Sequence, residues 1–369
     1  MTVPDQVQLK PGDTIGILGG GQLGRMLAMA AARLGLRCQV FSPDPDSPAF
    51  DVVLHATCAE YVDVEALELF AGDVDVITYE FENVPAASAM VLAAKRPVLP
   101  NRKTLETTQD RLAEKDFVRQ LDIGTADYAD VASAAALRAA IAKIGLPAVL
   151  KTRRFGYDGK GQAIIREGDD PDRIWEDLAT KSAILEAFIP FEREVSVIAA
   201  RNAQGQVECF DVTENEHSDH ILKTSRVPAA ISDTLAAQAR DIAERIANAL
   251  NYVGVLAVEL FVVRQGGEPR LLVNEIAPRV HNSGHWTLDG ASISQFEQHI
   301  RAIAGWPLGK PVRHGAVTMT NLIGDEVNSY ARWLTVPGAT VHLYGKGPPR
   351  PGRKMGHVTE VAAPSPKTA

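Results

Sequence analysis

Short apolar segments alternate with helical segments over residues 14–100. The first strand is predicted in TIGILG, and the helix that follows it, QLGRMLAMAAARLG, is expected to end at Gly35. Further strands are predicted in RCQVF and VDVITYE, and a further helix in AASAMVLAAK. Strands that alternate with helices pair in parallel, because the chain crosses back over the sheet between them. We therefore predict a Rossmann-like α/β domain at the N-terminus.

The pattern changes beyond this first segment. Helices are predicted at 104–124 and 132–144, and beyond Ser182 strands follow one another directly before two further helices near 233–250 and 294–304. Because a domain averages about 150 residues, a chain of 369 residues is expected to hold two or three. The predicted fold class is α/β and α+β, in three parts. These are an N-terminal α/β domain at 1–105, a larger α+β domain at 106–308 with a lid subdomain at about 120–185, and a small β-rich C-terminal domain at 309–369 that ends in a frayed tail.

The charge and the cysteines argue against several classes of protein. The 38 Lys and Arg and 46 Asp and Glu residues give a net charge of −8, which argues against a general binder of nucleic acid or of anionic membranes. Cys38, Cys58 and Cys209 are far apart and form no CxxC pair, so neither a disulfide framework nor a structural zinc site is indicated. The N-terminus lacks the pattern of a signal peptide, and no apolar run reaches the ~18 residues of a membrane helix. We expect a cytoplasmic protein.

The glycine-rich segment from Gly19 to Gly24 matches GxGxxG between a strand and a helix. Glycines allow the chain to approach a ligand closely, and the N-terminus of a helix attracts anions. Asp44, after the second strand, could then be the acid that binds the ribose of NAD or NADP. Two other interpretations stay open, namely a different anionic ligand and close packing of helix on sheet without a ligand.

A second glycine-rich segment follows the predicted strand PAVLK, which ends at Lys151. It includes Arg153, Arg154 and Lys160, and the strand AIIRE comes after it, so the glycines are expected at the tip of a hairpin. Such a loop can cover a polyphosphate with backbone N–H groups and basic side chains. It is not a P-loop, because GxxxxGK[ST] is absent. The alternative is a basic hairpin in solvent.

Two glutamates lie in consecutive predicted strands, Glu259 in VLAVELFVV and Glu275 in LLVNEIAP. With the turn at Gln265–Glu268, simple antiparallel pairing places the two acids opposite one another on the same face. Like charges at that spacing both stay ionised only beside a cation, and oxygen ligands near a phosphate loop favour Mg²⁺. A register shifted by one residue would instead leave one acid in solvent. Asn274 would point to the opposite face unless the strand is locally twisted.

Further candidates depend on weaker patterns. Glu186 ends an apolar strand, where backbone groups can contact an adenine edge, and Glu194 begins the next strand, where it can accept from ribose hydroxyls. His217 lies in a loop between acids, which is more often a surface position than a phosphate contact. His281 and His285 have no third ligand at a spacing suitable for zinc.

The C-terminal segment YGKGPPRPGRKMGH holds four positive charges in nine residues, from Lys346 to Lys354. A basic tail is one interpretation. Alternating Pro and Gly residues favour a shaped turn instead, in which the planar guanidinium groups of Arg350 and Arg353 can bind a phosphate monoester.

Six segments occur along this chain in a characteristic order: GGGQLGRM, YEFENVP, GYDGKGQ, EAFIPFEREVSV, NEIAPRVHNSGHWT and RPGRKMGHV. In these segments the chain resembles the ATP-grasp superfamily and, within it, the N5-carboxyaminoimidazole ribonucleotide synthetases of purine biosynthesis, over about residues 14–360. The resemblance implies a Rossmann-like pre-ATP-grasp domain, an ATP-grasp domain that holds ATP between its two halves, and a small C-terminal domain. It also implies a homodimer, and a ribonucleotide site between the N-terminal and ATP-grasp domains.

The resemblance further implies which residues form the site. ATP would be bound by Arg111, Lys151, Gly156, Tyr157, Asp158, Gly159, Lys160, Gly161, Gln162, Glu186, Ala187, Phe188, Ile189, Glu194, His217, Asn274 and Glu275. Mg²⁺ would be held by Glu259 and Glu275. The ribonucleotide would be bound by Gly21, Gln22, Leu23, Glu82, Asp158, Arg279, His281, Asn282, Ser283, Lys346 and Arg353. Lys151, Asp158 and Arg279 would take part in catalysis, and Lys115 is an alternative to Arg111, because many ATP-grasp enzymes have lysine at that place.

The implied reaction starts with attack of bicarbonate on the γ-phosphorus of ATP, which gives ADP and carboxyphosphate. The carboxyl group then passes, as CO₂, to the exocyclic amine of aminoimidazole ribonucleotide. The substrates would thus be ATP, bicarbonate and the ribonucleotide. Three other hypotheses are a related ATP-grasp ligase with a different acyl donor, an NAD-dependent oxidoreductase, and a nucleotide-binding regulator without turnover.

Overall fold

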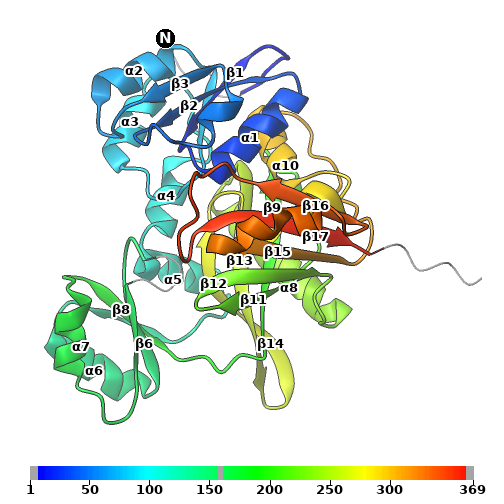
Figure 1. Cartoon of the computed structure of the whole chain (residues 1–369). Coiled ribbons are helices and arrows are strands. Elements are labelled where there is room, and N and C mark those ends of the chain that lie inside the picture. Colours follow the sequence, from blue (N-terminus) through cyan, green and yellow to red (C-terminus); the bar gives the residue numbers. More distant parts are fainter. Residues whose placement is uncertain (1–6, 157–160, 363–369) are drawn as a thin grey trace, which may run out of the picture.

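The computed structural model describes residues 7–156 and 161–362. Within them the strands form three sheets (Figure 1). The N-terminal sheet lies at the top of the figure, a long sheet crosses the middle, and a small sheet projects at the lower left.

The N-terminal sheet is parallel, which confirms the prediction from the alternation of strands and helices. Its strands are β1 (Thr14–Leu18), β2 (Arg37–Ser42), β3 (His55–Cys58) and β4 (Val76–Tyr79), in the order β3-β2-β1-β4. Its helices are α1 (Gln22–Arg33), η1 (Phe50–Val52), α2 (Val64–Gly72) and α3 (Ala86–Ala93). Gly35 has a φ of +75°, so the residue predicted to end the first helix adopts the left-handed conformation typical of a helix stop.

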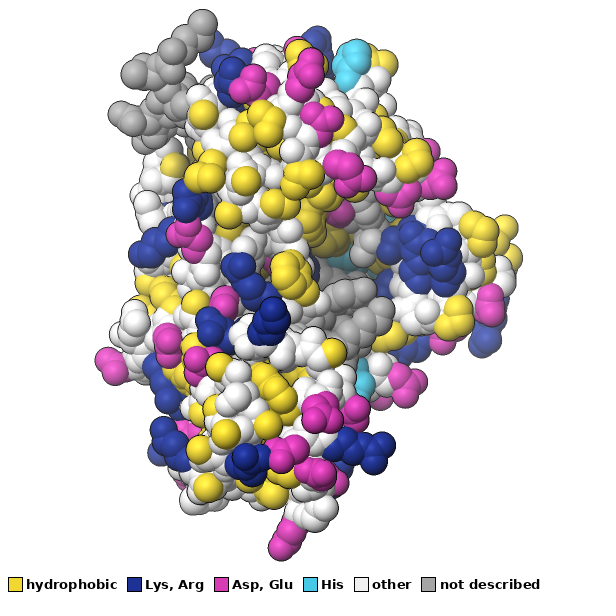
Figure 2. Space-filling view, turned by 90° about the vertical axis from the view of Figure 1, so that its left-hand side faces the viewer, with side chains coloured by type: hydrophobic (Ala, Val, Ile, Leu, Met, Phe, Trp, Pro, Cys, Tyr) yellow, Lys and Arg dark blue, Asp and Glu magenta, His cyan; other side chains and the backbone are white. Residues whose placement is uncertain are grey.

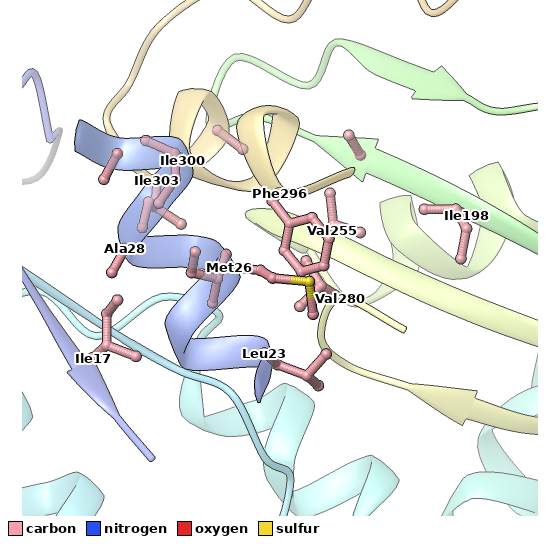
Figure 3. Packing of buried hydrophobic residues seen from close by; sticks show 14 of the residues in the cluster. Ile17, Leu23, Met26, Ala28, Ile198, Val255, Val280, Phe296, Ile300 and Ile303 are labelled. Carbon is pink, nitrogen blue, oxygen red and sulfur yellow. The ribbon is translucent and has the colours of Figure 1, made fainter. Parts of the chain in front are cut away.

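Helix α1 attaches this N-terminal unit to the rest of the molecule. Figure 3 shows Leu23 and Met26 of α1 beside Phe296 of α10 (Gln295–Ile303), with Val280 next to them. All four belong to one buried cluster that includes residues of the central sheet. Burial of each large apolar side chain contributes ~1.5–3 kcal/mol, so this contact fixes α1 against the central body.

The central sheet has the order β14-β13-β9-β11-β12-β15-β17-β16, with β10 paired to β9. Its strands are β9 (Arg193–Arg201), β10 (Val207–Cys209), β11 (Thr213–Ser218), β12 (Ile221–Val227), β13 (Gly254–Gln265), β14 (Glu268–Ala277), β15 (Val317–Ile323), β16 (Ala339–Leu343) and β17 (Lys354–Val361). Because β15 pairs with β12, the C-terminal strands extend this sheet. The sequence predicted a β-rich C-terminal region but not this continuity.

Helices cover both faces of the central sheet. Val197 and Ala199 of β9 pack in the cluster that contains α8 (Asp233–Ala249), whereas Ile198 and Ala200 pack in the cluster that contains α10. Successive side chains of a strand point to opposite faces, so the uninterrupted apolar run of β9 is buried on both sides.

The small sheet is antiparallel and has the order β5-β8-β6-β7. Its strands are β5 (Tyr128–Val131), β6 (Ala148–Thr152), β7 (Gln162–Ile165) and β8 (Ala183–Ala187), and its helices are α6 (Ala134–Ile144) and α7 (Pro171–Leu178). Lys151 pairs with Gln162 across β6 and β7, which confirms the predicted hairpin around the second glycine-rich segment. The tip, residues 157–160, lies outside the described residues.

The remaining helices are short connections. They are α4 (Arg102–Thr108), α5 (Arg111–Gln120), η2 (Asn282–Gly284), α9 (Thr287–Gly290), η3 (Gly324–Ser329) and α11 (Tyr330–Trp333). Side chains that accept backbone N–H groups start several helices of the chain, among them Asp63, Asn101, Asp110, Ser133, Ser232 and Ser294. Such caps satisfy amides that have no partner within the helix.

Candidate active site

An open cleft of about 1690 Å³ is lined by residues of the N-terminal unit, the small sheet and the central sheet. The face in Figure 2 is hollowed between the upper and lower parts of the molecule, and Lys and Arg side chains lie on both sides of the hollow. The cleft brings together these predicted site residues: Gln22, Leu23, Glu82, Arg111, Lys151, Gly156, Gln162, Glu186, Ala187, Phe188, Ile189, Glu194, His217, Glu259, Asn274, Glu275, Arg279, His281, Asn282, Lys346 and Arg353.

Three predicted residues are not part of this lining. Gly21 contributes its backbone N–H to Glu80, Gly161 accepts from the Thr152 amide, and the side chain of Ser283 is fully buried behind the wall. Tyr157, Asp158, Gly159 and Lys160 lie outside the described residues.

Glu259 and Glu275 occupy directly opposed positions of β13 and β14, as predicted from antiparallel pairing of the two strands. The turn at Gly266 and Gly267, with φ of +62° and +89°, is a two-residue hairpin turn. A β-bulge lies at Asn274, because Val273 pairs with Leu260 while Glu275 pairs with Glu259. The bulge is the local irregularity that Asn274 needs in order to lie on the same face of the strand as Glu275.

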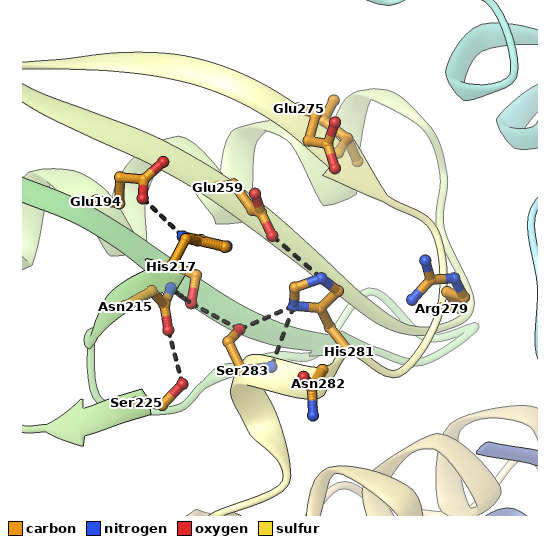
Figure 4. Close-up of polar contacts among 12 residues, drawn as sticks. Glu194, Asn215, His217, Ser225, Glu259, Glu275, Arg279, His281, Asn282 and Ser283 are labelled. Carbon is orange, nitrogen blue, oxygen red and sulfur yellow. Dashed lines mark hydrogen bonds and ion pairs between the residues drawn. The ribbon is translucent and has the colours of Figure 1, made fainter. Parts of the chain in front are cut away.

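The electrostatics of this acid pair resemble those of a cation site. Burial and the nearby charge of Glu275 raise the pKa of Glu259 to about 7. Arg111 Nη1 lies 3.1 Å from Glu275 Oε2, and His281 Nε2 lies 3.1 Å from Glu259 Oε1 (Figure 4). Two carboxylates at this spacing hold negative charge that a divalent ion can neutralise.

Glu186 stands between two lysines. Lys151 Nζ donates to Glu186 Oε2 at 3.0 Å, and Lys115 Nζ lies 3.7 Å from the same oxygen. Burial alone would raise the pKa of Glu186, but the two ammonium groups outweigh it and lower that pKa to about 2. Among the described residues, Glu186 Oε1 is buried and has no hydrogen-bond partner, so it can accept an N–H group of a ligand.

Lys115 is buried, with donors directed to Thr125 Oγ1 at 2.8 Å and to the Asn274 carbonyl at 2.8 Å. It therefore connects β8, through Glu186, with the bulge of β14. Arg111 is more accessible and also donates to the Gly156 carbonyl at 3.3 Å.

Two backbone amides at the end of β8, just after Glu186, already have hydrogen-bond partners within the protein. The Ala187 and Phe188 amides donate to the backbone carbonyls of Asp127 and Pro147. Beside them, Phe191 stacks on Phe261 with ring centroids 4.7 Å apart, which gives the cleft an apolar wall.

His217 points into the cleft and pairs with Glu194, with Nδ1 2.6 Å from Oε2 (Figure 4). Burial alone would lower the pKa of His217, but the Glu194 carboxylate outweighs it and raises that pKa. His217 is thus held in the wall of the cleft by Glu194 and does not lie in a solvated loop.

The opposite wall carries most of the predicted ribonucleotide residues. Arg279 makes two hydrogen bonds to the carboxylate of Glu82, which joins the central sheet to the N-terminal unit. Asn282 and Asn321 exchange amide hydrogen bonds of 3.0 and 2.7 Å. The Arg353 guanidinium donates to the Lys346 carbonyl, so the C-terminal basic segment forms a turn at the cleft, as predicted from its Pro and Gly residues.

The N-terminus of α1 is already occupied by a side chain. Glu80 accepts from the amides of Gly21 and Gly24 at 2.6 and 2.7 Å, so its carboxylate takes the place in which a dinucleotide fold binds pyrophosphate. A Cβ on Gly19 would lie 2.3 Å from Glu80 Cγ, so that glycine makes room for Glu80. The geometry therefore favours the packing interpretation of the first glycine-rich segment over NAD or NADP.

Comparisons with known proteins agree with this geometry. A model of the ribonucleotide synthetase preATP-grasp domain matches residues 13–109, an ATP-grasp domain model matches 116–296, and a phosphoribosylaminoimidazole carboxylase C-terminal domain model matches 317–368. The N5-carboxyaminoimidazole ribonucleotide synthase of Brucella melitensis is 51% identical, over 97% of this chain and 98% of its own length. The chain belongs to the N5-carboxyaminoimidazole ribonucleotide synthetase family.

Other members of the family are similar over the whole chain. The synthase of Pseudomonas aeruginosa is 46% identical, over 94% of this chain and 93% of its own. A crystal structure of an N5-carboxyaminoimidazole ribonucleotide synthetase with ADP has a TM-score of 0.93 and 40% identity, and covers 98% of this chain and 95% of its own. A structure of the Aspergillus clavatus synthase with ADP and 5-aminoimidazole ribonucleotide has a TM-score of 0.88 and 30% identity, with 95% and 94% covered.

Family membership confirms the predicted fold class, with pre-ATP-grasp, ATP-grasp and C-terminal domains, and excludes the NAD-dependent oxidoreductase hypothesis. ATP-grasp enzymes use ATP together with a divalent metal ion. In the described part of the chain, the helices are all too short or too polar to span a membrane.

Several residues of this synthetase site escaped sequence reasoning. Glu80 follows β4 directly in YEFEN. An acid at the end of a strand was the sequence signal that could have indicated this residue. Glu114 is buried in α5, accepts from the Ile276 amide, and has a pKa raised to about 8 by burial and by Glu275. Ser196, a polar residue within the apolar strand REVSVIAAR, was a signal of buried hydrogen bonding.

Proposed function

We propose that this cleft catalyses the ATP- and bicarbonate-dependent carboxylation of 5-aminoimidazole ribonucleotide to N5-carboxyaminoimidazole ribonucleotide, a step of purine biosynthesis. The observation that carries the proposal is the opposed pair Glu259 and Glu275 in a cleft whose walls carry Lys151, Arg111 and Arg279. Acids that hold a cation beside clustered positive charges are what phosphoryl transfer from ATP requires.

The donor set fits Mg²⁺. Glu259 and Glu275 would hold the ion. Burial and the charge of Glu275 raise the pKa of Glu259, and a bound cation would offset both effects. The ion would neutralise charge on the phosphates when bound. Arg111, which now pairs with Glu275, would contact a phosphate, and we prefer it to Lys115 because the ammonium of Lys115 is buried among protein acceptors.

ATP would lie against the small sheet and the adjoining end of the central sheet. Lys151 and the segment from Gly156 to Gln162, with Tyr157, Asp158, Gly159, Lys160 and Gly161, would contact its phosphates. Glu186 to Ile189 would hold adenine, with Glu186 Oε1 accepting from the adenine amino group. Glu194 would accept from ribose hydroxyls, and His217 and Asn274 would lie near the phosphates.

The ribonucleotide would lie between the N-terminal unit and the central sheet. Glu82, Arg279, His281 and Asn282 would surround it, and Gly21 to Leu23 would close one end. Lys346 and Arg353 would bind its 5′-phosphate, since paired cations suit a phosphate monoester. In this way, two negative substrates would share one cleft.

In the proposed reaction, an oxygen of bicarbonate attacks the γ-phosphorus of ATP, and the bond from that phosphorus to ADP breaks. The carboxyphosphate that forms releases CO₂ and phosphate, and the exocyclic amine attacks the CO₂ and loses a proton. Lys151 and Arg279 would spread the charge of the transferring group. Asp158 would orient the amine or accept its proton. Holding the amine beside the carboxyl donor can lower the barrier by ~7–11 kcal/mol.

The remaining predictions belong to the same proposal. The domains would divide at 105/106 and 308/309, with the lid at about 120–185. The enzyme would be a cytoplasmic homodimer, with no nucleic acid or membrane as partner.

The test measures ADP release from purified protein and MgATP, with bicarbonate and the ribonucleotide added or omitted. We expect rapid ADP release only when both are present. ADP release that depends on formate instead of bicarbonate would indicate a related ligase. ATP binding without any ADP release would indicate a regulator, and either result would contradict the proposal.

A further inference from the structure

A chain of buried hydrogen bonds runs behind the wall of the cleft and ends at His281 (Figure 4). Ser225 Oγ donates to Asn215 Oδ1 at 2.8 Å, and Asn215 Nδ2 donates to Ser196 Oγ at 2.9 Å. Ser196 Oγ lies 2.8 Å from Ser283 Oγ, which in turn lies 2.9 Å from His281 Nδ1. The hydroxyls of Ser196, Ser225 and Ser283 are fully buried, so solvent does not compete with these bonds.

The direction of this chain is fixed at its inner end. The Ser283 amide donates to His281 Nδ1 over a long 3.3 Å, which favours an Nδ1 that accepts and carries no proton, and the hydroxyl contact at 2.9 Å is the stronger of the two. The Ser283 hydroxyl therefore donates to Nδ1 as well. In the neutral imidazole the proton is then on Nε2, which faces Glu259 Oε1 at 3.1 Å.

The same direction explains the order of the remaining groups. The Ser283 hydroxyl donates its only proton to His281. In the hydrogen bond between Ser283 and Ser196, the Ser196 hydroxyl is therefore the donor and the Ser283 oxygen the acceptor. The Ser196 oxygen must then accept from an N–H donor, and Asn215 presents its amide nitrogen there. The amide oxygen of Asn215 faces the hydroxyl of Ser225, which completes the chain without conflict.

We propose that Ser225, Asn215, Ser196 and Ser283 are positioning residues that hold His281 as the Nε2–H tautomer, and that His281 thereby orients the Glu259 carboxylate for its cation. The inference rests on the proposed role of Glu259. A donor on Oε1 restricts rotation of the carboxylate and leaves its second oxygen for the ion. Groups that orient a metal ligand in this way commonly change metal affinity 10–100-fold when they are removed.

The first experiment reads the tautomer directly. Long-range ¹H–¹⁵N correlation spectra of the whole protein without nucleotide, labelled at histidine, report which ring nitrogen carries the proton, and a His281→Gln variant assigns the signals. We expect the Nε2–H form alone in the parent. We expect a mixture of tautomers in Ser283→Ala, because Nδ1 then keeps only the 3.3 Å amide contact. An Nδ1–H or doubly protonated ring in the parent, or an unchanged ring in Ser283→Ala, would overturn the proposal.

A substitution three hydrogen bonds away from the histidine tests the direction of the chain. Asn215→Asp keeps the shape but replaces the donor to Ser196 by an acceptor, so the Ser196 proton turns to residue 215. The Ser283 hydroxyl then donates to Ser196 instead of to His281, which favours a proton on Nδ1. We expect that shift, and an unchanged Nε2–H ring would overturn the proposal. If this buried charge prevents folding, Ser283→Ala still decides the question. Ser225→Ala is the matched control, because loss of this last hydroxyl demands no reversal.

The second experiment measures the consequence for the cation, with Mn²⁺ as the probe and its affinity followed by electron paramagnetic resonance in the presence of ADP. We expect Ser283→Ala to weaken Mn²⁺ binding about 10-fold and Ser225→Ala to change it less than twofold. Equal affinities in the parent and Ser283→Ala would overturn the positioning role. Unchanged affinity in Glu259→Gln would instead refute the proposed cation role of Glu259, which is a separate failure that the tautomer measurement does not share.

Discussion

Glu259 and Glu275 face one another across β13 and β14, and the bulge at Asn274 lies immediately beside the second of them. Burial makes this proximity costly, since Glu275 is one of the groups that raise the pKa of Glu259. Two acids that repel each other in the wall of a cleft do not stabilise the fold. A cation between them removes the repulsion, and this is the physical basis of the proposed ATP chemistry.

Glu275→Gln should therefore reduce ADP formation by at least about 100-fold, because it removes a charged cation ligand while it preserves the shape of the side chain. Steady-state ADP release measures the effect. The matched control is Glu268→Gln, an exposed acid on the same strand, which should retain parental turnover. Near-normal turnover in Glu275→Gln would refute the metal assignment.

Lys115→Met should destabilise the fold by about 3–5 kcal/mol, because it leaves the buried carboxylate of Glu186 with Lys151 as its remaining close cation. Urea denaturation measures the loss. Lys103→Met, at an exposed position of α4, should change the free energy of unfolding by less than about 0.5 kcal/mol.

A double variant separates charge from packing in this cluster. Combined with Glu186→Gln, the Lys115→Met change should cost less than it does alone, since a neutral amide needs no compensating ammonium. Strictly additive free energies for the two substitutions would contradict the assigned ion pair.

The acid pair could be predicted because register in a hairpin is a local property of the sequence. Counting back from the two-residue turn at Gly266 and Gly267 would place Asn274 opposite Glu259. The bulge at Asn274 shifts the pairing by one residue, so that Glu275 lies opposite Glu259 instead. The parallel N-terminal sheet was predictable for a different reason, because strands that alternate with helices pair in parallel. By contrast, Lys115 meets Glu186, and Glu80 meets Gly21, only because separate segments dock, and no periodicity in the chain encodes those contacts.

The extension of the central sheet by the C-terminal strands could not be predicted from the sequence either. Thr224 of β12 pairs with Thr320 of β15, and along the chain the two strands are separated by α8, β13, β14, η2, α9 and α10. A sequence pattern indicates that each is a strand but gives no partner for it. The chain of hydrogen bonds from Ser225 to Ser283 crosses three strands of this sheet and ends in η2, so it too depended on the tertiary arrangement.

His299 makes stability depend on pH. It is buried between the N-terminal unit and the central sheet, accepts from the Val255 amide through Nδ1, and contacts Thr78 through Nε2 at 2.9 Å. Burial lowers its pKa from 6.5 to about 3. Between these two pH values, His299 is protonated in the unfolded chain but not in the folded protein. The free energy of unfolding should therefore fall as the pH falls from about 6.5 towards 3.

His299→Asn should remove the contribution of this one proton to the pH dependence of stability. We expect the slope of unfolding free energy against pH to be smaller by up to about 1.4 kcal/mol per pH unit between pH 5.5 and 4. Urea denaturation at several pH values gives the slope, whatever the variant loses in stability at pH 7. His55→Asn, at an exposed position of β3, should leave the slope unchanged, and equal slopes in parent and His299→Asn would contradict the role of the buried ring.

Gly21→Ala tests the close approach of α1 to Glu80. The φ of Gly21 is −73°, so alanine meets no backbone strain there, but its Cβ would lie 2.6 Å from Glu80 Oε1 and would displace the carboxylate from the amides it caps. We expect a loss of about 1–3 kcal/mol in the free energy of unfolding. Gly72→Ala is the matched control, because its Cβ would have no heavy atom within 4 Å and the residue ends α2, where alanine should be neutral or stabilising by up to about 1 kcal/mol. Equal stabilities for the two variants would show that the first glycine-rich segment does not depend on room for Glu80.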